Sequence, residues 1–352
     1  MNNFGRIKTQ VKSYPPAYFA LVMATGIISI GCQQLHLNVI ADTLFVLNNV
    51  QYIILLFVFI VRIILYFPEV KKDLATHAKG AGFLTFVAGS SIVGTGYVEG
   101  KQMFLFGIIL LILAFIAYLI ILYSFLASVI LQQQKPSLES GLNGSWLLLV
   151  VSTQSLVILA TSLVQHQSIP VNFILFPTLS AWLAGIILYV IFVTIIMYRL
   201  TFYPVNASEV SPSYWIDTGA AAITTVAGAT LSSALAGIND LKEYIPVINL
   251  LSLLLWAVAT FWLPLLFILE TWRHFKIGYK YSPDYWSIVF PLGMYTVATL
   301  KIESTFRITF LNTITYVFIF VALTAWMVVF TGMVIKLGRS LFSNKSVETT
   351  NI

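Results

Sequence analysis

Phe290 and Pro291 are the residues of this sequence whose types and spacing suggest a chemical role most directly. They lie in the apolar stretch Tyr281–Ile302, YSPDYWSIVFPLGMYTVATLKI, with Gly293 just after them. A proline removes a backbone donor and clashes with the preceding turn, so the pattern predicts a kinked, broken helix. In lipid, the freed carbonyl is tolerated only where protein or a water-filled cavity satisfies it. We therefore expect Phe290 to gate a pathway, although an ordinary packing role is the alternative for one of 26 phenylalanines.

Hydroxyl side chains in other apolar segments are candidates for the wall of such a pathway. Hydroxyls and the positive amino ends of helices can solvate an anion without a fixed countercharge. They can equally bond to their own helix or join neighbouring helices. No lysine or arginine lies deep inside these segments, which favours the weak binding that conduction requires. The pore-lining candidates are Thr25, Ser29, Ser90, Thr95, Ser152, Ser155, Thr224, Thr225, Tyr295 and Thr296.

Asp217 is the clearest carboxylate near an apolar segment, two residues beyond Trp215. One interpretation is a hydrated residue at the membrane interface or at a helix start. The other is a protonatable group that couples transport to a proton gradient. The sequence leaves both interpretations open.

Enzymatic and nucleic-acid-binding functions find no support in the sequence. The four histidines are scattered, and Cys32 is the single cysteine, so we expect no metal site and no cofactor. The string GSSIVGTG (Gly89–Gly96) resembles a phosphate loop but lacks the lysine that such loops carry. The basic residues lie in loops and tails without a patterned patch, which argues against nucleic acid as a partner.

The composition defines the elements that must position these residues. The chain has 352 residues, of which 59% are hydrophobic and 9% charged, as expected for an integral membrane protein that is all α-helical. We expect residues 1–13 and 337–352 to be cytoplasmic tails around one membrane domain, 14–336. Segments of about 20 apolar residues can span a bilayer. Ten occur, near 14–36, 41–66, 79–98, 102–131, 144–165, 173–199, 214–236, 246–270, 283–303 and 309–336.

The distribution of basic residues predicts how these segments are oriented. With alternating spans, fifteen of the 19 lysines and arginines fall on one side. The four on the other side are Lys101, Lys242, Lys301 and Arg307. Because cytoplasmic loops carry the excess of positive charge, both termini should be cytoplasmic in a multi-pass protein of the plasma membrane.

An internal repeat is visible in the ten segments. The odd-numbered segments are mostly interrupted by glycine or proline, whereas the even-numbered ones are bulky, and the odd segments begin about every 65–70 residues. A unit of two helices returns the chain to its starting side. The pattern therefore predicts five parallel helical hairpins. The odd helices should surround a central pore and the even helices should face lipid.

Four motifs resemble one known family. They are PPAYFALVMATGIISIG (Pro15–Gly31), GAGFLTFVAGSSIVGTG (Gly80–Gly96), YWIDTGAAAITTVAGATL (Tyr214–Leu231) and YWSIVFPLGMYTVAT (Tyr285–Thr299). They are similar to signatures of the tellurite-resistance/dicarboxylate transporter family. That family includes plant slow-type anion channels and fungal malate and sulfite transporters.

The resemblance implies ten helices and a homotrimer with a separate pore in each protomer. It also implies that Phe290 is the gating phenylalanine, from the pattern W-x-x-x-F-P at Trp286–Pro291. Asp217 departs from the neutral residue expected there. The short tails lack the long regulatory ends of the plant channels, so we expect no kinase control.

These observations together predict an anion transporter or channel rather than an enzyme. Its partners should be a small anionic substrate and the lipid bilayer. The expected cargoes are C4-dicarboxylates such as malate, followed by chloride, nitrate, sulfite or tellurite. The alternative is proton-coupled uptake of C4-dicarboxylates that uses Asp217.

Overall fold

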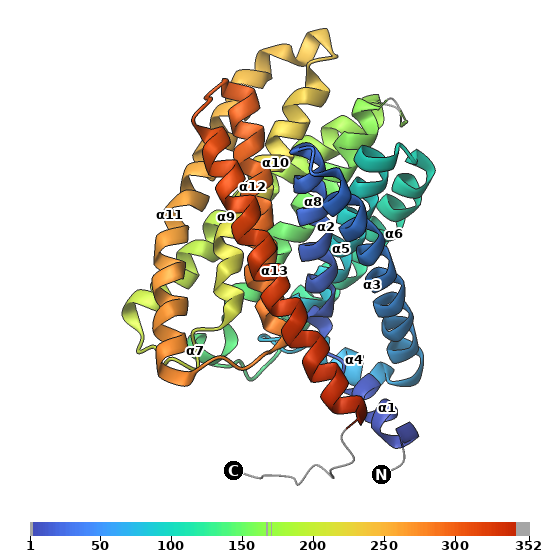
Figure 1. The fold of residues 1–352 in the computed structure, drawn as a ribbon, viewed down its shortest axis with the longest axis vertical. Coiled ribbons are helices and arrows are strands. Elements are labelled where there is room, and N and C mark those ends of the chain that lie inside the picture. The colour runs from blue at the N-terminus through green and yellow to red at the C-terminus, as the bar shows by residue number, and fades with distance from the viewer. Residues whose placement is uncertain (1–2, 167, 170, 343–352) are drawn as a thin grey trace.

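The computed structural model describes residues 3–342 except 167 and 170, and within these the chain forms helices and no strand (Figure 1). The first helix, α1 (Asn3–Lys12), and the end of the last, α13 (Leu311–Phe342), lie at the same end of the molecule (Figure 1). Both helices extend into the predicted tails. Residues 1–2 and 343–352 of those tails lie outside the described residues.

Five helices form the centre of the molecule. Each contacts the next in chain order, and the fifth contacts the first, so together they close a ring. We call them the inner helices. They are α2 (Ala20–Gln34), α5 (Leu84–Thr95), α8 (Leu148–Gln165), α10 (Ile216–Leu235) and α12 (Trp286–Phe306).

Every inner helix is preceded by a short 3₁₀ turn. These turns are η1 (Pro16–Phe19), η2 (Gly80–Phe83), η4 (Gly144–Leu147), η5 (Pro212–Trp215) and η7 (Pro283–Tyr285). Three of them carry proline in their first positions, where its missing N–H costs nothing. In η4, η5 and η7 a side chain (Asn143, Ser211 or Ser282) accepts a hydrogen bond from the backbone two residues on. The same entry structure therefore recurs five times, at the spacing of the sequence repeat.

Five long helices lie outside the ring, each packed on the inner helix that precedes it in the chain. These outer helices are α3 (Asn38–Leu65), α6 (Phe104–Leu131), α9 (Val171–Phe202), α11 (Ile245–Ile277) and α13. In their most apolar stretches only 17–33% of residues are buried, against 83–100% in α2, α5, α8 and α10. The outer helices therefore present apolar side chains to the surroundings, as contact with lipid requires.

Nine helices in the described part of the chain are long and apolar enough to cross a membrane. They comprise the five outer helices and four inner ones together with their 3₁₀ turns. Helix α12, at the place of the predicted segment 283–303, is not among the nine; it carries Lys301 and Glu303 near its end. The connections add α4 (Phe67–Leu74), α7 (Leu138–Gly141), η3 (Gly96–Gly100, a π-helix) and η6 (Asn239–Tyr244).

The expectation that Pro291 breaks its helix is wrong. Helix α12 is continuous from Trp286 to Phe306, with Pro291 inside it. The small residues here serve close packing instead. A Cβ atom at Gly219 of α10 would lie 2.8 Å from the Pro291 ring, and one at Gly293 would lie 2.9 Å from Ile27 of α2. Glycine at both positions lets α12 approach its two neighbours in the ring.

Candidate functional site

A cavity of about 340 Å³ opens at the entry ends of the inner helices. Residues from all five entry segments line it, so it lies on the axis of the ring, and we call it the vestibule. Its polar lining includes Ser13, Asp73, Lys79, Thr85, Asn143, Ser145, Ser211, Ser213, Asp284 and Ser287. Because five helices begin around it, the vestibule collects the partial positive charge of their amino ends.

A second, smaller cavity of about 30 Å³ lies farther along the same helices. All five inner helices contribute to this second cavity too, so it shares the axis with the vestibule. We call it the outer cavity. Its polar lining consists of Gln34, Thr95, Glu99, Ser155, Ser162, Thr230 and Lys301. Since later residues of every helix line it, the five inner helices run parallel, with their carboxyl ends toward this cavity.

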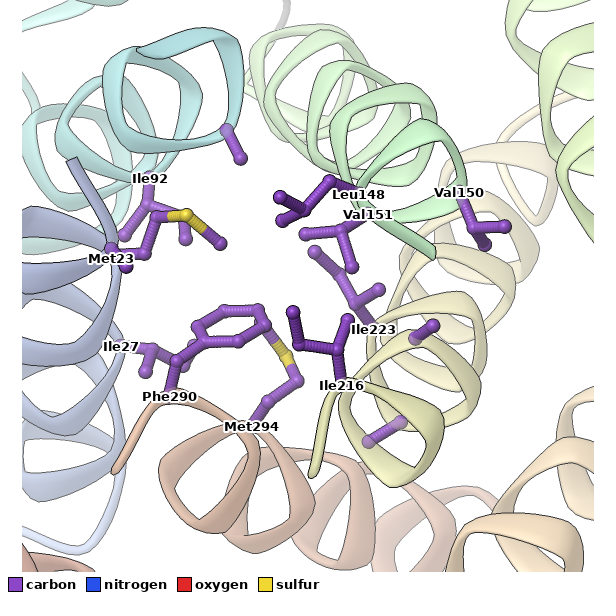
Figure 2. Packing of buried hydrophobic residues seen from close by; sticks show 14 of the residues in the cluster. Met23, Ile27, Ile92, Leu148, Val150, Val151, Ile216, Ile223, Phe290 and Met294 are labelled. Carbon is purple, nitrogen blue, oxygen red and sulfur yellow. The ribbon is translucent and has the colours of Figure 1, made fainter. Parts of the chain in front are cut away.

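An apolar layer separates the two cavities. Figure 2 shows the Phe290 ring at the centre of the helices, facing side chains from the other elements of the ring. Phe290 is 1% exposed and lines the vestibule, whereas Met294, one turn later, lines the outer cavity. We call this layer the plug; it comprises Met23, Ile27, Ile92, Leu148, Ile216, Phe290 and Met294. A tight apolar constriction excludes ions both sterically and by repelling water.

Two of the ten predicted pore-lining residues line an axial cavity. Thr95 and Ser155 both face the outer cavity. Their hydroxyls donate to carbonyls of their own helices, at 3.0 Å to Ser91 and 2.8 Å to Ser152. Of the gate residues, Phe290 lines the vestibule, and Pro291 packs against α10 beside it.

Five other candidates contact outer helices instead. The Trp326 indole of α13 donates to Thr25, and Tyr52 of α3 bonds Ser90, at 3.0 and 2.9 Å. Ser29, Thr225 and Tyr295 make comparable bonds to Ala41, Ser252 and Thr260 of outer helices. These hydroxyls join the two layers of helices, so they have a packing role away from the axis.

The last three candidates, Ser152, Thr224 and Thr296, bond to carbonyls of their own helices. None of the three is among the residues that line the vestibule or the outer cavity. Their hydroxyls satisfy the backbone rather than a ligand.

Most residues that line the two cavities were not among the predicted pore-lining residues. Ser287, Phe290, Met294, Val297 and Lys301 line the axial cavities at spacings of three and four residues along α12. Residues so spaced share one face of a helix. Extending this spacing from Phe290 in both directions would have found the stripe in the sequence.

Asp217 lies outside the axial cavities and is fully buried. Neither of its carboxylate oxygens has a hydrogen-bond partner among the described residues. Tyr189 of α9 and Tyr214 lie close enough to interact with it electrostatically. Asp217 does lie in the first turn of α10, as the helix-start interpretation predicted, but its full burial contradicts the expectation of a hydrated carboxylate. A buried carboxylate without a partner is costly to ionise.

Buried arginines tie the outer helices to the vestibule end of the molecule. Arg62 pairs with Asp73, which also contacts Lys79 at 3.6 Å. Arg199 donates to Glu209 at 3.0 Å. Hydrogen bonds from Asn206 and Arg199 lower the pKa of the exposed Glu209 carboxyl. These pairs join the ends of α3 and α9 to the segments that precede η2 and η5.

Within residues 3–342, leaving aside 167 and 170, no group of three or more histidine, cysteine, aspartate or glutamate side chains is arranged to hold a metal ion. The polar groups on the axis are hydroxyls, amides, carboxylates and lysine ammonium groups.

The ring of apolar helices with cavities on its axis defines a membrane protein of the channel and transporter class. Residues 13–334 match the family described as voltage-dependent anion channel. The chain therefore belongs to this family, which is the tellurite-resistance/dicarboxylate transporter family suggested by the motifs.

Similar proteins from other organisms are described as transporters or membrane proteins. An uncharacterized transporter of Methanocaldococcus jannaschii is 21% identical over 350 residues, covering 93% of this chain and 96% of its own. A second from the same organism is 22% identical over 309 residues, covering 83% and 86%. An uncharacterized membrane protein of Mycobacterium tuberculosis strain H37Rv is 30% identical over 159 residues, covering 44% and 79%.

Proposed function

We propose that this protein passes small anions across the cell membrane along the axis of the inner helices, with Phe290 as the gate. The main observation that supports this proposal is that the vestibule and the outer cavity lie on one axis with the apolar plug between them. Membership of an anion channel family supports the same function. No catalytic step and no cofactor enter this proposal.

The proposal includes the membrane arrangement. Helix α12 is the tenth span, and each inner helix forms a hairpin with the outer helix that follows it, which gives five parallel hairpins. The excess of lysine and arginine on one side favours cytoplasmic termini in the plasma membrane. The vestibule, which Ser13 and Tyr14 help to line, then opens to the cytoplasm.

The sizes and charges of the cavities favour small monovalent anions such as chloride and nitrate. Five helix amino ends attract anions into the vestibule without binding them tightly. The vestibule can hold an anion as large as malate, but a cavity of about 30 Å³ has room for only one small ion. Malate, sulfite or tellurite would pass only if the plug and the outer cavity widened together.

The test is anion current through purified protein in planar bilayers, with chloride, nitrate and malate compared. Phe290→Ala removes the ring from the plug and should raise the chloride current at least tenfold. Phe86→Ala is the matched control, because Phe86 is also buried, at 5% exposed against 1% for Phe290, but packs on Phe19 and Phe59. An unchanged current in Phe290→Ala, or an equal rise in Phe86→Ala, would overturn the gate assignment.

We also propose that the protein is a homotrimer with one pore in each protomer. The family resemblance and the broad apolar surface of the outer helices support this state. Native mass spectrometry in mild detergent should give three times the chain mass of 39.2 kDa. A purely monomeric spectrum from protein that conducts anions would exclude it.

A proton-coupled carrier of C4-dicarboxylates is the second candidate. The buried and unpaired state of Asp217 favours it, because such a carboxylate can exchange a proton. Its position away from both axial cavities argues against direct contact with the anion. Malate uptake driven by a proton gradient, abolished in Asp217→Asn, would establish this mechanism, and uptake that ignores the gradient would exclude it.

A further inference from the structure

Lys301 is a cation on the axis without an acidic partner. It lines the outer cavity, and among the described residues its ammonium makes no ion pair within 4 Å. Lys101, another basic residue predicted on the same side, differs in this respect. Its ammonium lies 2.7 Å from Asp42, outside the ring. Lys301 is therefore placed to interact with a mobile ion rather than a fixed one.

The carboxyl ends of the inner helices make the outer cavity unfavourable for an anion unless positive charge is also present. All five run parallel, so their carboxyl ends, with partial negative charge, surround the outer cavity. Glu99 adds a carboxylate to the same lining, and the imidazole of His166 lies 3.8 Å from it. An anion that has crossed the plug would meet repulsion here unless a cation offset it. Lys301 is the one lysine or arginine in the lining of the outer cavity.

Three of the neighbouring hydroxyls are occupied, which leaves the Lys301 ammonium as the charged donor beside Ser162 and the Gln34 amide. Thr95 and Ser155 donate to their own helices, and Thr230 does the same to Ala227 at 3.0 Å. The three donors of an ammonium remain available to a ligand. The small volume favours a small ion as that ligand.

We propose that Lys301 forms a weak binding site for one small monovalent anion at the outer end of the pore. This inference rests on the proposed anion conduction and adds the residue that controls it at that end. Lys301 is only partly buried, so solvent screens its charge and keeps the binding weak. Weak binding lets the ion leave, which conduction requires.

The conduction test uses the Phe290→Ala channel with chloride on both sides of a planar bilayer. Lys301→Gln should lower the current carried by chloride entering from the outer-cavity side by about three- to fivefold. Chloride entering from the vestibule should be affected less, so the current becomes rectified. Glu99→Gln should shift the rectification in the opposite direction. Lys301→Arg should preserve the parent current.

Lys101→Gln is the matched control, since it removes a basic residue of the same side that does not line the axis. An unchanged rectification in Lys301→Gln, or the same change in Lys101→Gln, would overturn the proposal.

A binding measurement separates this proposal from the proposed function. Crystals of the Phe290-containing protein soaked in bromide should show anomalous density beside Lys301, and Lys301→Gln crystals should show none. Bromide at Lys301 in a protein that never conducts would support the site while the conduction proposal failed. No bromide at Lys301 in well-diffracting crystals of the unmodified chain would contradict the site.

Discussion

The inner helices have two faces that use polar and apolar residues in opposite ways. On the outward face, hydroxyls bridge to the outer helices, as Ser90 does to Tyr52 and Tyr295 to Thr260. On the axial face, the layer between the two cavities is apolar and includes Phe290. Hydroxyls thus hold the two layers of helices together, while apolar side chains close the path.

This difference follows from what surrounds each face. Lipid provides no hydrophobic force between helices, so hydrogen bonds and close packing must join them. An aqueous path is closed most readily by apolar surface that water avoids. Changes on the axial face should therefore alter current with little effect on stability, and changes on the outward face should do the reverse.

The largest effect after removal of the Phe290 ring should come from its neighbour Met294. Met294 belongs to the plug and lines the outer cavity on its far side from Phe290. In the Phe290→Ala channel, Met294→Ala should raise the chloride current a further two- to fivefold, measured in planar bilayers, because the remaining apolar constriction widens. Met327→Ala, at a site 61% exposed on α13, is the control. A current no larger than that of Phe290→Ala would place the constriction elsewhere.

A moderate effect on stability is expected at Thr25. Thr25→Val keeps the shape of the side chain but leaves the Trp326 indole without its acceptor. Thermal unfolding in detergent should show a loss of about 1 kcal/mol, in the range for hydrogen bonds between membrane helices. Current through the Phe290→Ala channel should not change. Thr324→Val, which affects only a bond within α13, should be neutral.

Tyr295→Phe should have a smaller effect of the same kind. It removes the hydroxyl that bonds Thr260 and keeps the ring contacts with Trp256 and Phe318. We expect about 0.6 kcal/mol of lost stability and an unchanged preference between chloride and nitrate. An altered preference would show that Tyr295 contacts the permeating ion, which would break the distinction between the two faces.

The smallest effect should come from the exposed Glu209 carboxylate, which pairs with the buried Arg199 and belongs to neither face. Because the pKa of Glu209 is lowered in the folded protein, its contribution to stability is present above the pKa of the unfolded carboxyl. That contribution is lost as the pH falls through the lowered folded value. Glu209→Gln has no such contribution to lose. Its melting temperature should therefore fall slightly less than that of the unmodified protein as the pH is lowered through this acidic range. An identical decline in both proteins would show that the pair contributes nothing.

The positions of the helices along the chain could be predicted from the sequence, but the rotation of each helix about its own axis could not. The predicted segment 144–165 coincides with η4 and α8, and the five-fold recurrence of entry turns follows the predicted repeat. The rotation of each helix could not be predicted, because inner helices such as α8 are buried on all sides and show no dominant apolar face. Hydroxyls such as Thr25 and Thr95 therefore looked alike in sequence, although only Thr95 lines an axial cavity.

The most direct test of a single path closed by Phe290 is side-specific chemical labelling. Cys32 is the single cysteine and is buried, so the unmodified chain gives the background. Ser287→Cys places a thiol in the vestibule, and dicyanoaurate serves as a small thiol-reactive anion. Vesicles of both orientations separate the two sides, and maleimide capture after denaturation reports which thiols remain free.

With Phe290 in place, the thiol should react when the anion is added from the vestibule side only. In Phe290→Ala it should react from both sides. Reaction from both sides with Phe290 present, or from one side only in Phe290→Ala, would contradict the account.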